Sequence, residues 1–437
     1  MNRVLVVGDS GREHSLAWKL HQSPSVDEVI CAPGNPGMAD IGECLAVHAN
    51  DPMAVAELAD RVDASLVVVG PEAPLVAGVC DAVRASGRLA FGPSAEAAKL
   101  EGSKAWMKDV LLSAGVPTAR HATFGADELD AALAYLEDSQ GLWVVKTDGL
   151  AAGKGVAVSD SLGEARASLK RYLSGEAFGD AGRTCVIEER MTGPEISLFV
   201  LCDGTNAVPM VCAQDHKRVG DGDTGLNTGG MGAYSPVPFA NDALVRELMA
   251  RAIDPTLEEL RAREVEFRGV LYCGVMLTPS GPKILEYNVR FGDPECEILM
   301  RRMSSDLYVH LLESAQGSLH TPIEFCDDAA VAVCLAADGY PATPIRGDVI
   351  SGVDAANALP DVVVFHAGTQ RNNGELLTNG GRVLVVTATG ATIDEAQIKA
   401  YEGVDAISWP GMHYRTDIGA QAVVHGDHAP LHPMSPE

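Results

Sequence analysis

The segment VVKTDGLAAGKGVAV, residues 144–158, carries a lysine inside a glycine-rich turn and distinguishes two kinds of nucleotide-binding fold. A P-loop reads G-x-x-x-x-G-K-[ST] and joins a strand to a helix. Here the spacing from Gly149 to Gly153 is one residue too short, and Gly155 stands where a P-loop has Ser or Thr. The valines that follow alternate as they do in a strand. The segment therefore predicts a strand, a glycine turn and a second strand, which is either a flap over a polyphosphate or a plain surface hairpin.

Length, charge and cysteine content narrow the class of protein. A chain of 437 residues has room for two to four domains. Its 33 basic and 60 acidic residues give a net charge of −27, which argues against binding to nucleic acid or to an anionic membrane. No apolar run approaches the roughly 18 residues of a membrane span, and the first apolar run is too short for a signal peptide. Ten cysteines without a C-x-x-C pair indicate reduced thiols in the cytoplasm.

The first 92 residues alternate between strand and helix patterns. Strands are expected at RVLVVG, EVICAPG, SLVVVG and RLAFGP, with helices over residues 13–20, 53–62 and 73–86. This alternation predicts a parallel sheet with right-handed crossovers. Gly8, Gly34 and Gly70 follow three of the strands, at the sheet edge where such folds bind ligands.

Composition divides the rest of the chain. A helix is expected within residues 101–117, followed by a small unit that contains the opening segment. A fresh run of strands begins at Ala329, with a helix over 393–402. The expected domains are residues 1–121, 122–191, 192–328 and 329–437. The fold class is a multidomain mixture of α/β and α+β units.

The strongest chemical pattern is KILEYNVRFGDPE, residues 283–295. Alternation along a strand would place three polar side chains on one face, those of Glu286, Asn288 and Arg290. The opposite, packed face would carry the apolar side chains of Leu285, Tyr287 and Val289. Carboxylate and amide oxygens suit Mg²⁺, and an adjacent arginine could contact the same phosphates. The alternative is a solvent-facing polar strand.

Three further segments have the composition of binding loops. QDHKRVGDGDTGLNTGGMGAYSP, residues 214–236, is long and glycine-rich, and its basic triplet on an acidic protein favours an anion site. GDSGREHSLAW, residues 8–18, joins a strand to a helix whose N–H groups could receive a phosphate, although it is not a dinucleotide fingerprint. In CVIEERMTGPEIS, residues 185–197, a connector could read adenine while Glu195 binds ribose hydroxyls.

Taken together and in this order, the segments resemble the glycinamide ribonucleotide synthetase (phosphoribosylamine–glycine ligase) family of the ATP-grasp superfamily. The resemblance runs from GREH through GPEAPLV, LEGSKAWMKD, KTDGLAAGKGV, GGMGAYSP and RFGDPE to FHAGT and TNGGRVL. It implies a parallel α/β N-terminal domain, two central ATP-grasp subdomains and a small α/β C-terminal domain.

The resemblance also implies a set of functional residues. It assigns ATP binding to Lys104, Lys146, Gly149, Gly153, Lys154, Gly155, Glu188, Glu189, Met191 and Glu195. It assigns Mg²⁺ or Mn²⁺ to Glu286 and Asn288, and catalysis to Arg290, Lys217 and Asp293. We expect phosphoribosylamine beside Gly8, Gly11, Arg12, Glu13, His14, Gly70, Pro71 and Glu72, and glycine beside Asp215, His216, Arg218 and Glu295.

The implied reaction joins glycine to 5-phospho-β-D-ribosylamine through glycyl phosphate, at the expense of ATP, in the second step of de novo purine synthesis. We expect a cytoplasmic, monofunctional enzyme with small-molecule partners, monomeric or else homodimeric. The alternatives are another ATP-grasp ligase or carboxylase, and a non-catalytic nucleotide-binding protein. Three departures from the family pattern affect local contacts: Ser10 would restrict the approach to its backbone amide, and Thr147 and the 190–192 connector would loosen adenine stacking.

Overall fold

The N-terminal part is a parallel five-stranded sheet in the order β3-β2-β1-β4-β5. The computed structural model describes residues 1–139, 143–150, 155–177 and 179–422. The strands are β1 (Arg3–Gly8), β2 (Glu28–Pro33), β3 (Glu43–Cys44), β4 (Leu66–Val69) and β5 (Leu89–Phe91). In β1, Leu5 and Val7 belong to one core cluster and Val4 and Val6 to another, so both faces of the sheet are covered. The prediction of a parallel α/β domain is confirmed.

Helices on both faces of this sheet explain the continuous apolar strands. They are α1 (Gly11–His21), the short η1 (Met38–Asp40), α2 (Pro52–Arg61), α3 (Glu72–Ala77) and α4 (Val79–Ala85). The single helix expected over residues 73–86 is wrong, because Gly78 adopts a left-handed conformation with φ of 90° and separates α3 from α4. The helix expected within 101–117 is likewise divided into α5 (Lys99–Gly102) and α6 (Lys104–Ser113), with the Ser103 side chain capping α6.

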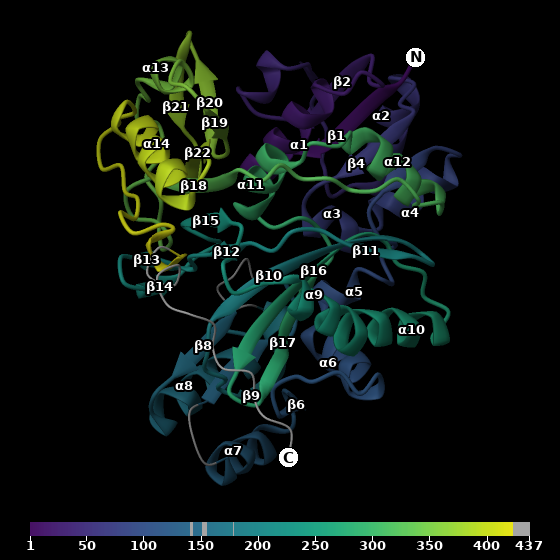
Figure 1. Cartoon of the computed structure of the whole chain (residues 1–437). Coiled ribbons are helices and arrows are strands. Elements are labelled where there is room, and N and C mark those ends of the chain that lie inside the picture. The colour runs from purple at the N-terminus through teal and green to yellow at the C-terminus, as the bar shows by residue number, and fades with distance from the viewer. Residues whose placement is uncertain (140–142, 151–154, 178, 423–437) are drawn as a thin grey trace.

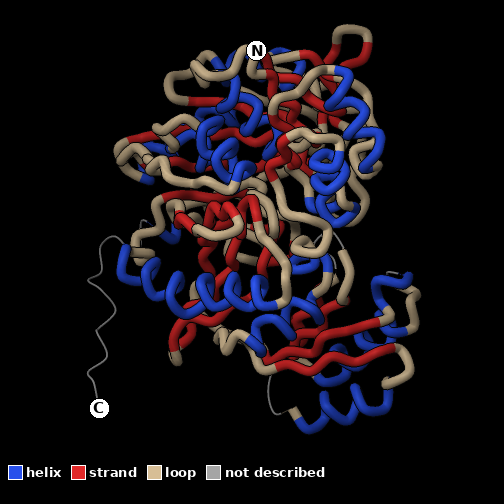
Figure 2. Tube along the Cα trace, turned by 90° about the vertical axis from the view of Figure 1, so that its right-hand side faces the viewer, coloured by secondary structure: helices blue, strands red, loops and turns tan. Residues whose placement is uncertain are grey.

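A small antiparallel module follows and projects from the rest of the molecule (Figure 2). Its sheet has the order β6-β9-β7-β8. Its elements are β6 (His121–Gly125), α7 (Leu129–Asp138), β7 (Trp143–Thr147), β8 (Val156–Ser159), α8 (Leu162–Leu173), η2 (Gly179–Gly182) and β9 (Thr184–Glu189). Strands β7 and β8 pair antiparallel, which confirms the two strands expected in the opening segment, while residues 151–154 of the expected turn lie outside the described residues. The module has a core cluster of its own.

The second central sheet, of order β11-β10-β16-β17, is also antiparallel. Its strands are β10 (Glu195–Asp203), β11 (Ala207–Pro209), β16 (Arg268–Thr278) and β17 (Gly281–Asn288). The helices of this region are α9 (Asp242–Leu248), the π-helix η3 (Met249–Ile253), α10 (Asp254–Ala262), α11 (Glu295–Arg302) and α12 (Leu307–Gln316).

A bulge in β17 changes which side chains face the core. Gly274 pairs with Glu286, but the next residue, Val275, pairs with Ile284, so Leu285 is an extra residue in its strand. Ile284 therefore lies in the core with Tyr287 and Val289. The expectation that Leu285 packs there is wrong, because regular alternation stops at the bulge.

The last sheet combines strands from distant parts of the chain, in the order β12-β15-β18-β22-β19 (Figure 1). Its strands are β12 (Gln214–Asp215), β15 (Gly232–Ser235), β18 (Ala329–Ala336), β19 (Val362–His366) and β22 (Arg382–Gly390). The sheet therefore draws strands from both sides of residue 329. The accompanying elements are the hairpins β13 (Arg218–Gly220) with β14 (Thr224–Asn227) and β20 (Thr369–Asn372) with β21 (Glu375–Thr378), and the helices α13 (Val353–Asn357) and α14 (Ile393–Asp405). Within the described ranges, no helix is long and apolar enough to span a bilayer.

Candidate active site

One cavity of about 920 Å³ collects most of the residues proposed for function. Its wall is formed by the start of α1, by α5 and α6, by the small module, by β17 and by the C-terminal sheet. The proposed residues that line it are Arg12, Glu72, Lys104, Lys146, Gly155, Glu188, Glu189, Met191, Glu195, Asp215, Lys217, Arg218, Glu286, Asn288, Arg290, Asp293 and Glu295. Arg12 and Glu295, which are 283 positions apart in the chain, thus line the same cavity.

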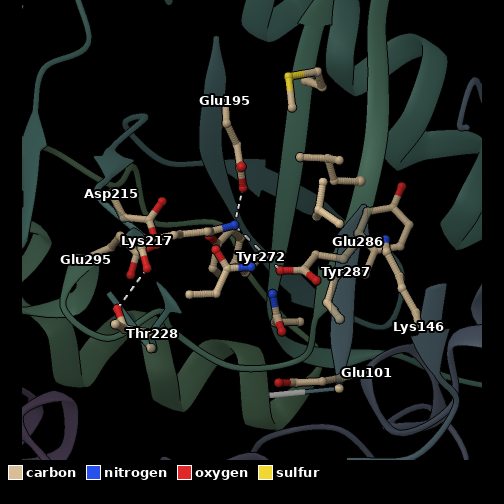
Figure 3. A pocket seen from close by; sticks show the side chains of 18 of the residues that line it. Glu101, Lys146, Glu195, Asp215, Lys217, Thr228, Tyr272, Glu286, Tyr287 and Glu295 are labelled. Carbon is tan, nitrogen blue, oxygen red and sulfur yellow. Dashed lines mark hydrogen bonds and ion pairs between the residues drawn. The ribbon is translucent and has the colours of Figure 1, made fainter. Parts of the chain in front are cut away.

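Glu286 lies at the centre of the charged groups in this cavity. The Lys217 ammonium is 3.8 Å from a Glu286 carboxylate oxygen and also forms a short ion pair with Glu195 (Figure 3). Burial would raise the pKa of Glu286, but the cations around it, Lys217 foremost, lower that pKa to about 2. Glu286 is therefore ionised at neutral pH, and its side chain, 36% exposed, lines the cavity.

Glu286 and Asn288 offer the donor chemistry of a magnesium site. Asn288 is nearly buried, and its amide oxygen accepts a 3.3 Å hydrogen bond from Arg290. The described residues contain no group of three or more His, Cys, Asp or Glu side chains arranged for a metal. Mg²⁺ usually takes one or two protein ligands and completes its shell with water and substrate phosphates. An ionised carboxylate and an amide oxygen beside a large cavity fit that pattern.

Arg290 is held by carboxylates from the N-terminal part of the chain. Its Nη2 donates to Glu101 Oε1 at 2.8 Å, and its Nε is 3.5 Å from Glu72 Oε2. Glu101 also accepts the backbone N–H of Val289 at 2.8 Å. These contacts fix the guanidinium at the cavity edge. Sequence reasoning missed Glu101, which lies 189 residues from its partner in the chain and carries no local signal.

Asp293 is fixed from two sides. Its carboxylate accepts a 2.8 Å hydrogen bond from the Ser10 hydroxyl and forms a 2.9 Å ion pair with Arg382. Burial raises the pKa of Asp293, but Arg382 and then Arg12 more than compensate and lower it. The Ser10 amide, whose accessibility the sequence put in question, already donates to Glu13 at 2.9 Å. Arg382, which lines the cavity from the C-terminal sheet, was also missed.

The Glu188 carboxylate lies between two lysines instead of facing open space. Its oxygens are 3.0 Å from Lys146 Nζ and 3.2 Å from Lys108 Nζ, and all three side chains are almost fully buried. Burial would raise the pKa of Glu188, but the two lysines lower it. Burial also lowers the pKa of Lys108 to about 8. The side chain of Glu188 thus anchors Lys146, while its backbone lies between those of β6 and β7 in the sheet. Lys108 was not foreseen.

Asp215 and Glu295 form a second acidic region beside Lys217 (Figure 3). Glu295 accepts a 3.3 Å hydrogen bond from the Ser197 hydroxyl, which also contacts the Tyr272 hydroxyl at 2.8 Å. Burial raises the pKa of Asp215 well above its usual range, and Glu295 adds to this rise while Lys217 opposes it. Asp215 therefore holds its proton more tightly than an ordinary aspartate does.

Eight other proposed residues do not line the cavity. They are Gly8, Gly11, Glu13, His14, Gly70, Pro71, Gly149 and His216. A β-carbon at Gly8 or Gly70 would overlap with the Glu13 side chain, so these glycines make room for Glu13. His14 Nδ1 accepts the backbone N–H of His366 at 2.7 Å.

Two of these positions have distinct surroundings. His216 is buried beside Tyr234, and neither of its ring nitrogens has a hydrogen-bond partner among the described residues. The Gly149 carbonyl accepts a 3.5 Å hydrogen bond from Lys104. Gly153 and Lys154 lie outside the described residues.

Comparison with known proteins matches three parts of the chain to the domains of one protein family. Phosphoribosylglycinamide synthetase models match in order: the N domain over residues 2–101, the ATP-grasp (A) domain over 102–296 and the C domain over 330–421. Phosphoribosylamine–glycine ligase from Mesorhizobium japonicum is 50% identical over 421 residues, covering 96% of this chain and 98% of the relative. The corresponding ligase from Streptomyces coelicolor is 48% identical over 425 residues, which is 96% of this chain and 99% of the relative.

Solved structures agree. The crystal structure of phosphoribosylamine–glycine ligase from Thermotoga maritima has a TM-score of 0.82 at 34% identity, with 95% of this chain and 99% of that chain covered. Biotin carboxylase from Campylobacter jejuni has a TM-score of 0.72 at 14% identity over 98% of this chain and 97% of that chain, which is a similarity of fold alone. With three domain models matched in order and half of the residues identical across nearly its full length, the chain belongs to the phosphoribosylglycinamide synthetase family.

Proposed function

We propose that the chain joins the carboxylate of glycine to the amine of 5-phospho-β-D-ribosylamine, converting ATP to ADP and phosphate and yielding glycinamide ribonucleotide. The observation that carries the proposal is the cavity itself. It brings the cationic groups of Lys104, Lys146 and Arg290 to the Glu286–Asn288 pair, with a separate acidic region alongside. The first set suits a triphosphate and its metal, and the second suits an amino acid.

In the first step, a glycine carboxylate oxygen attacks the γ-phosphorus of ATP, and ADP leaves. Lys104 and Lys146 are placed to neutralise phosphate charge, because both line the cavity and Lys146 is held in position by Glu188. Glu286 and Asn288 would hold Mg²⁺ or Mn²⁺, which supplies charge neutralisation between the phosphates. Arg290, oriented by Glu101 and Glu72, faces the charge that develops during transfer.

The acidic region is proposed to receive glycine. Asp215 and Glu295 would accept hydrogen bonds from the glycine ammonium, and Lys217 would face its carboxylate and then the acyl phosphate. Burial first and Glu295 next raise the pKa of Asp215, and an arriving ammonium group would stabilise the charged form of this carboxylate.

In the second step, the ribosylamine nitrogen attacks the glycyl carbonyl carbon, and phosphate leaves while the nitrogen loses a proton. We assign the ribosylamine to the side of the cavity formed by Arg12 and Glu72, because these residues lie at the starts of α1 and α3, just beyond the ends of β1 and β4. Water would have to be excluded from the labile intermediate, and the glycine-rich turn expected to do this includes residues 151–154, which lie outside the described residues.

The proposed setting is a cytoplasmic monomer that binds small molecules. The net charge of −27 supports partners other than nucleic acid, and ten free cysteines support a reducing compartment.

The test is ADP release with ATP, Mg²⁺, glycine and freshly generated phosphoribosylamine, with each component omitted in turn. We expect release to require both glycine and the ribosylamine. Glu286→Gln should lower kcat by about 100-fold or more, because it removes charge needed where the phosphoryl group is transferred. Glu258→Gln, an exposed substitution on α10, is the matched control. ADP release that ignores glycine would contradict the substrate assignment.

A further inference from the structure

The hairpin β13–β14 forms part of the cavity wall but has little core to hold it in place. Arg218, Asp223 and Asn227 line the cavity from this hairpin. Leu226 is 60% exposed, and the hairpin has no buried side chain between Arg218 and Asn227. A two-stranded hairpin of this kind is marginally stable by itself. Its position must therefore be set by polar contacts.

Those contacts come from residues 413–421, near the end of the described chain, which we call the clamp. Figure 1 shows this segment passing beside β13 and β14. At its centre, Arg415 is completely buried. Its Nη1 donates to Asp223 Oδ1 at 2.7 Å and to the Arg218 carbonyl at 3.2 Å, while Nε and Nη2 hold Asp417 in a bidentate pair at 2.7 and 2.6 Å. This use of a planar, forked donor set is specific to arginine.

Further bonds from the clamp reach the turn between β13 and β14. The backbone N–H and hydroxyl of Thr416 donate to the Asp221 carboxylate at 2.8 and 2.6 Å. Asp417 accepts the Gly222 N–H at 2.9 Å. Gln421, which itself lines the cavity, donates to Asp223 at 3.1 Å.

The clamp is in turn fixed to the C-terminal sheet and helix. The Tyr401 hydroxyl on α14 donates to the Arg415 carbonyl at 2.8 Å and accepts the Ile418 N–H at 3.1 Å. His413 exchanges two backbone hydrogen bonds with Ala336 at the end of β18, at 2.7 and 2.9 Å. The hairpin is thereby held against a rigid element instead of another loop.

Displacement of the hairpin would disturb one part of the cavity selectively. Lys217 immediately precedes β13, and its carbonyl accepts two bonds from Thr228 just after β14, at 2.8 and 2.9 Å. Asp215 lies two residues further back, in β12. In contrast, Lys146 and Glu188 belong to the small module, and no hydrogen bond or ion pair between these two residues and the clamp occurs within the described ranges.

We propose that Arg415 is a positioning residue for the glycine end of the cavity: it holds β13–β14 so that Lys217 and Asp215 keep their geometry. The identity of the affected substrate rests on the proposed function, whereas the role of Arg415 in holding the hairpin rests on the contacts described above.

The experiment compares full-length wild type, Arg415→Ala, Arg415→Lys and Arg263→Ala. Arg263 also joins two carboxylates, Asp109 and Glu259, but lies outside the cavity and serves as the matched control. Hydrogen exchange is measured over residues 218–228, together with KM for glycine and KM for ATP.

For Arg415→Ala we expect faster exchange confined to the hairpin and clamp. We also expect a rise of about tenfold or more in KM for glycine, with KM for ATP within about twofold, since small misplacements of binding groups cost rate steeply. Arg415→Lys should be intermediate, because it keeps the charge but loses the fork. Arg263→Ala should resemble wild type.

Unchanged hairpin exchange in Arg415→Ala would overturn the proposal, as would faster exchange throughout the chain with both KM values raised. If Arg415→Ala does not fold, Arg415→Lys and Asp223→Asn decide the same question by local exchange. If wild type releases ADP without glycine, the proposed function fails, and the exchange result still decides the role of Arg415.

Discussion

At the scale of single residues, the contacts of Glu188 with Lys108 and Lys146 predict how substitutions there change the free energy of unfolding. The triad carries a net positive charge in a buried place. Glu188→Gln would leave both ammonium groups without a counter-charge, at an expected cost of about 3–5 kcal/mol in the free energy of unfolding. Lys108→Met should cost less than half as much, because it leaves the Lys146–Glu188 pair intact. Urea unfolding of the two variants measures the difference.

The pH dependence of the same variants provides the control. The folded pKa of Lys108 is about 8, below its ordinary value of 10.5. Between these values the unfolded chain still holds a proton that the folded chain has released. As pH rises through this window, the free energy of unfolding of wild type should therefore increase relative to that of Lys108→Met. Equal costs for both variants, or no relative gain, would show that the triad is not organised around Glu188.

These residues also mark what the sequence can and cannot reveal. Glu286 and Asn288 were recognisable because alternation within one strand places them together. Glu101, Lys108 and Arg382 were not, since each becomes significant only through a partner contributed by a distant part of the fold. Hydrogen bonding between such segments leaves no periodic signal in either of them.

At the scale of elements, the bulge in β17 predicts opposite behaviour for two adjacent residues. Ile284 is buried in the main core, whereas Leu285 lines the cavity. Ile284→Ala should therefore lower the free energy of unfolding by about 2–5 kcal/mol, the range for large-to-small changes in a core. Leu285→Ala should lower it by less than about 1 kcal/mol, as expected outside a core. Thermal and urea unfolding of the pair provide the measurement.

A larger cost at Leu285 than at Ile284 would mean that β17 alternates regularly and that the bulge is absent. The sequence could not anticipate the bulge, because it depends on how β17 pairs with β16. The two-helix arrangement of residues 72–85 is different. Gly78 was visible in the sequence, but its left-handed conformation is one of several that glycine permits.

At the scale of the whole molecule, the buried apolar side chains of the described residues form three core clusters, which the domains share unequally. Two of them run through the N-terminal, central and C-terminal sheets, so these sheets share their cores. The third lies entirely within residues 132–187 of the small module. Regions with few shared apolar contacts open first in proteins, so the module should unfold before the rest.

Tryptophan fluorescence can separate the two events. Trp143 packs on the core of the module and donates to the Leu136 carbonyl at 2.9 Å, while Trp18, Trp106 and Trp409 pack on the shared cores. We expect wild type to unfold in urea through two fluorescence transitions, the earlier of which disappears in Trp143→Phe. Far-UV circular dichroism of that variant should still show both steps, because the module remains present. Trp106→Phe should reduce only the later fluorescence step. A single transition that coincides for all probes would instead mean that the small module unfolds cooperatively with the shared cores, through the ion pairs that Glu188 makes with Lys108 of α6 and that Glu189 makes with Lys283 of β17.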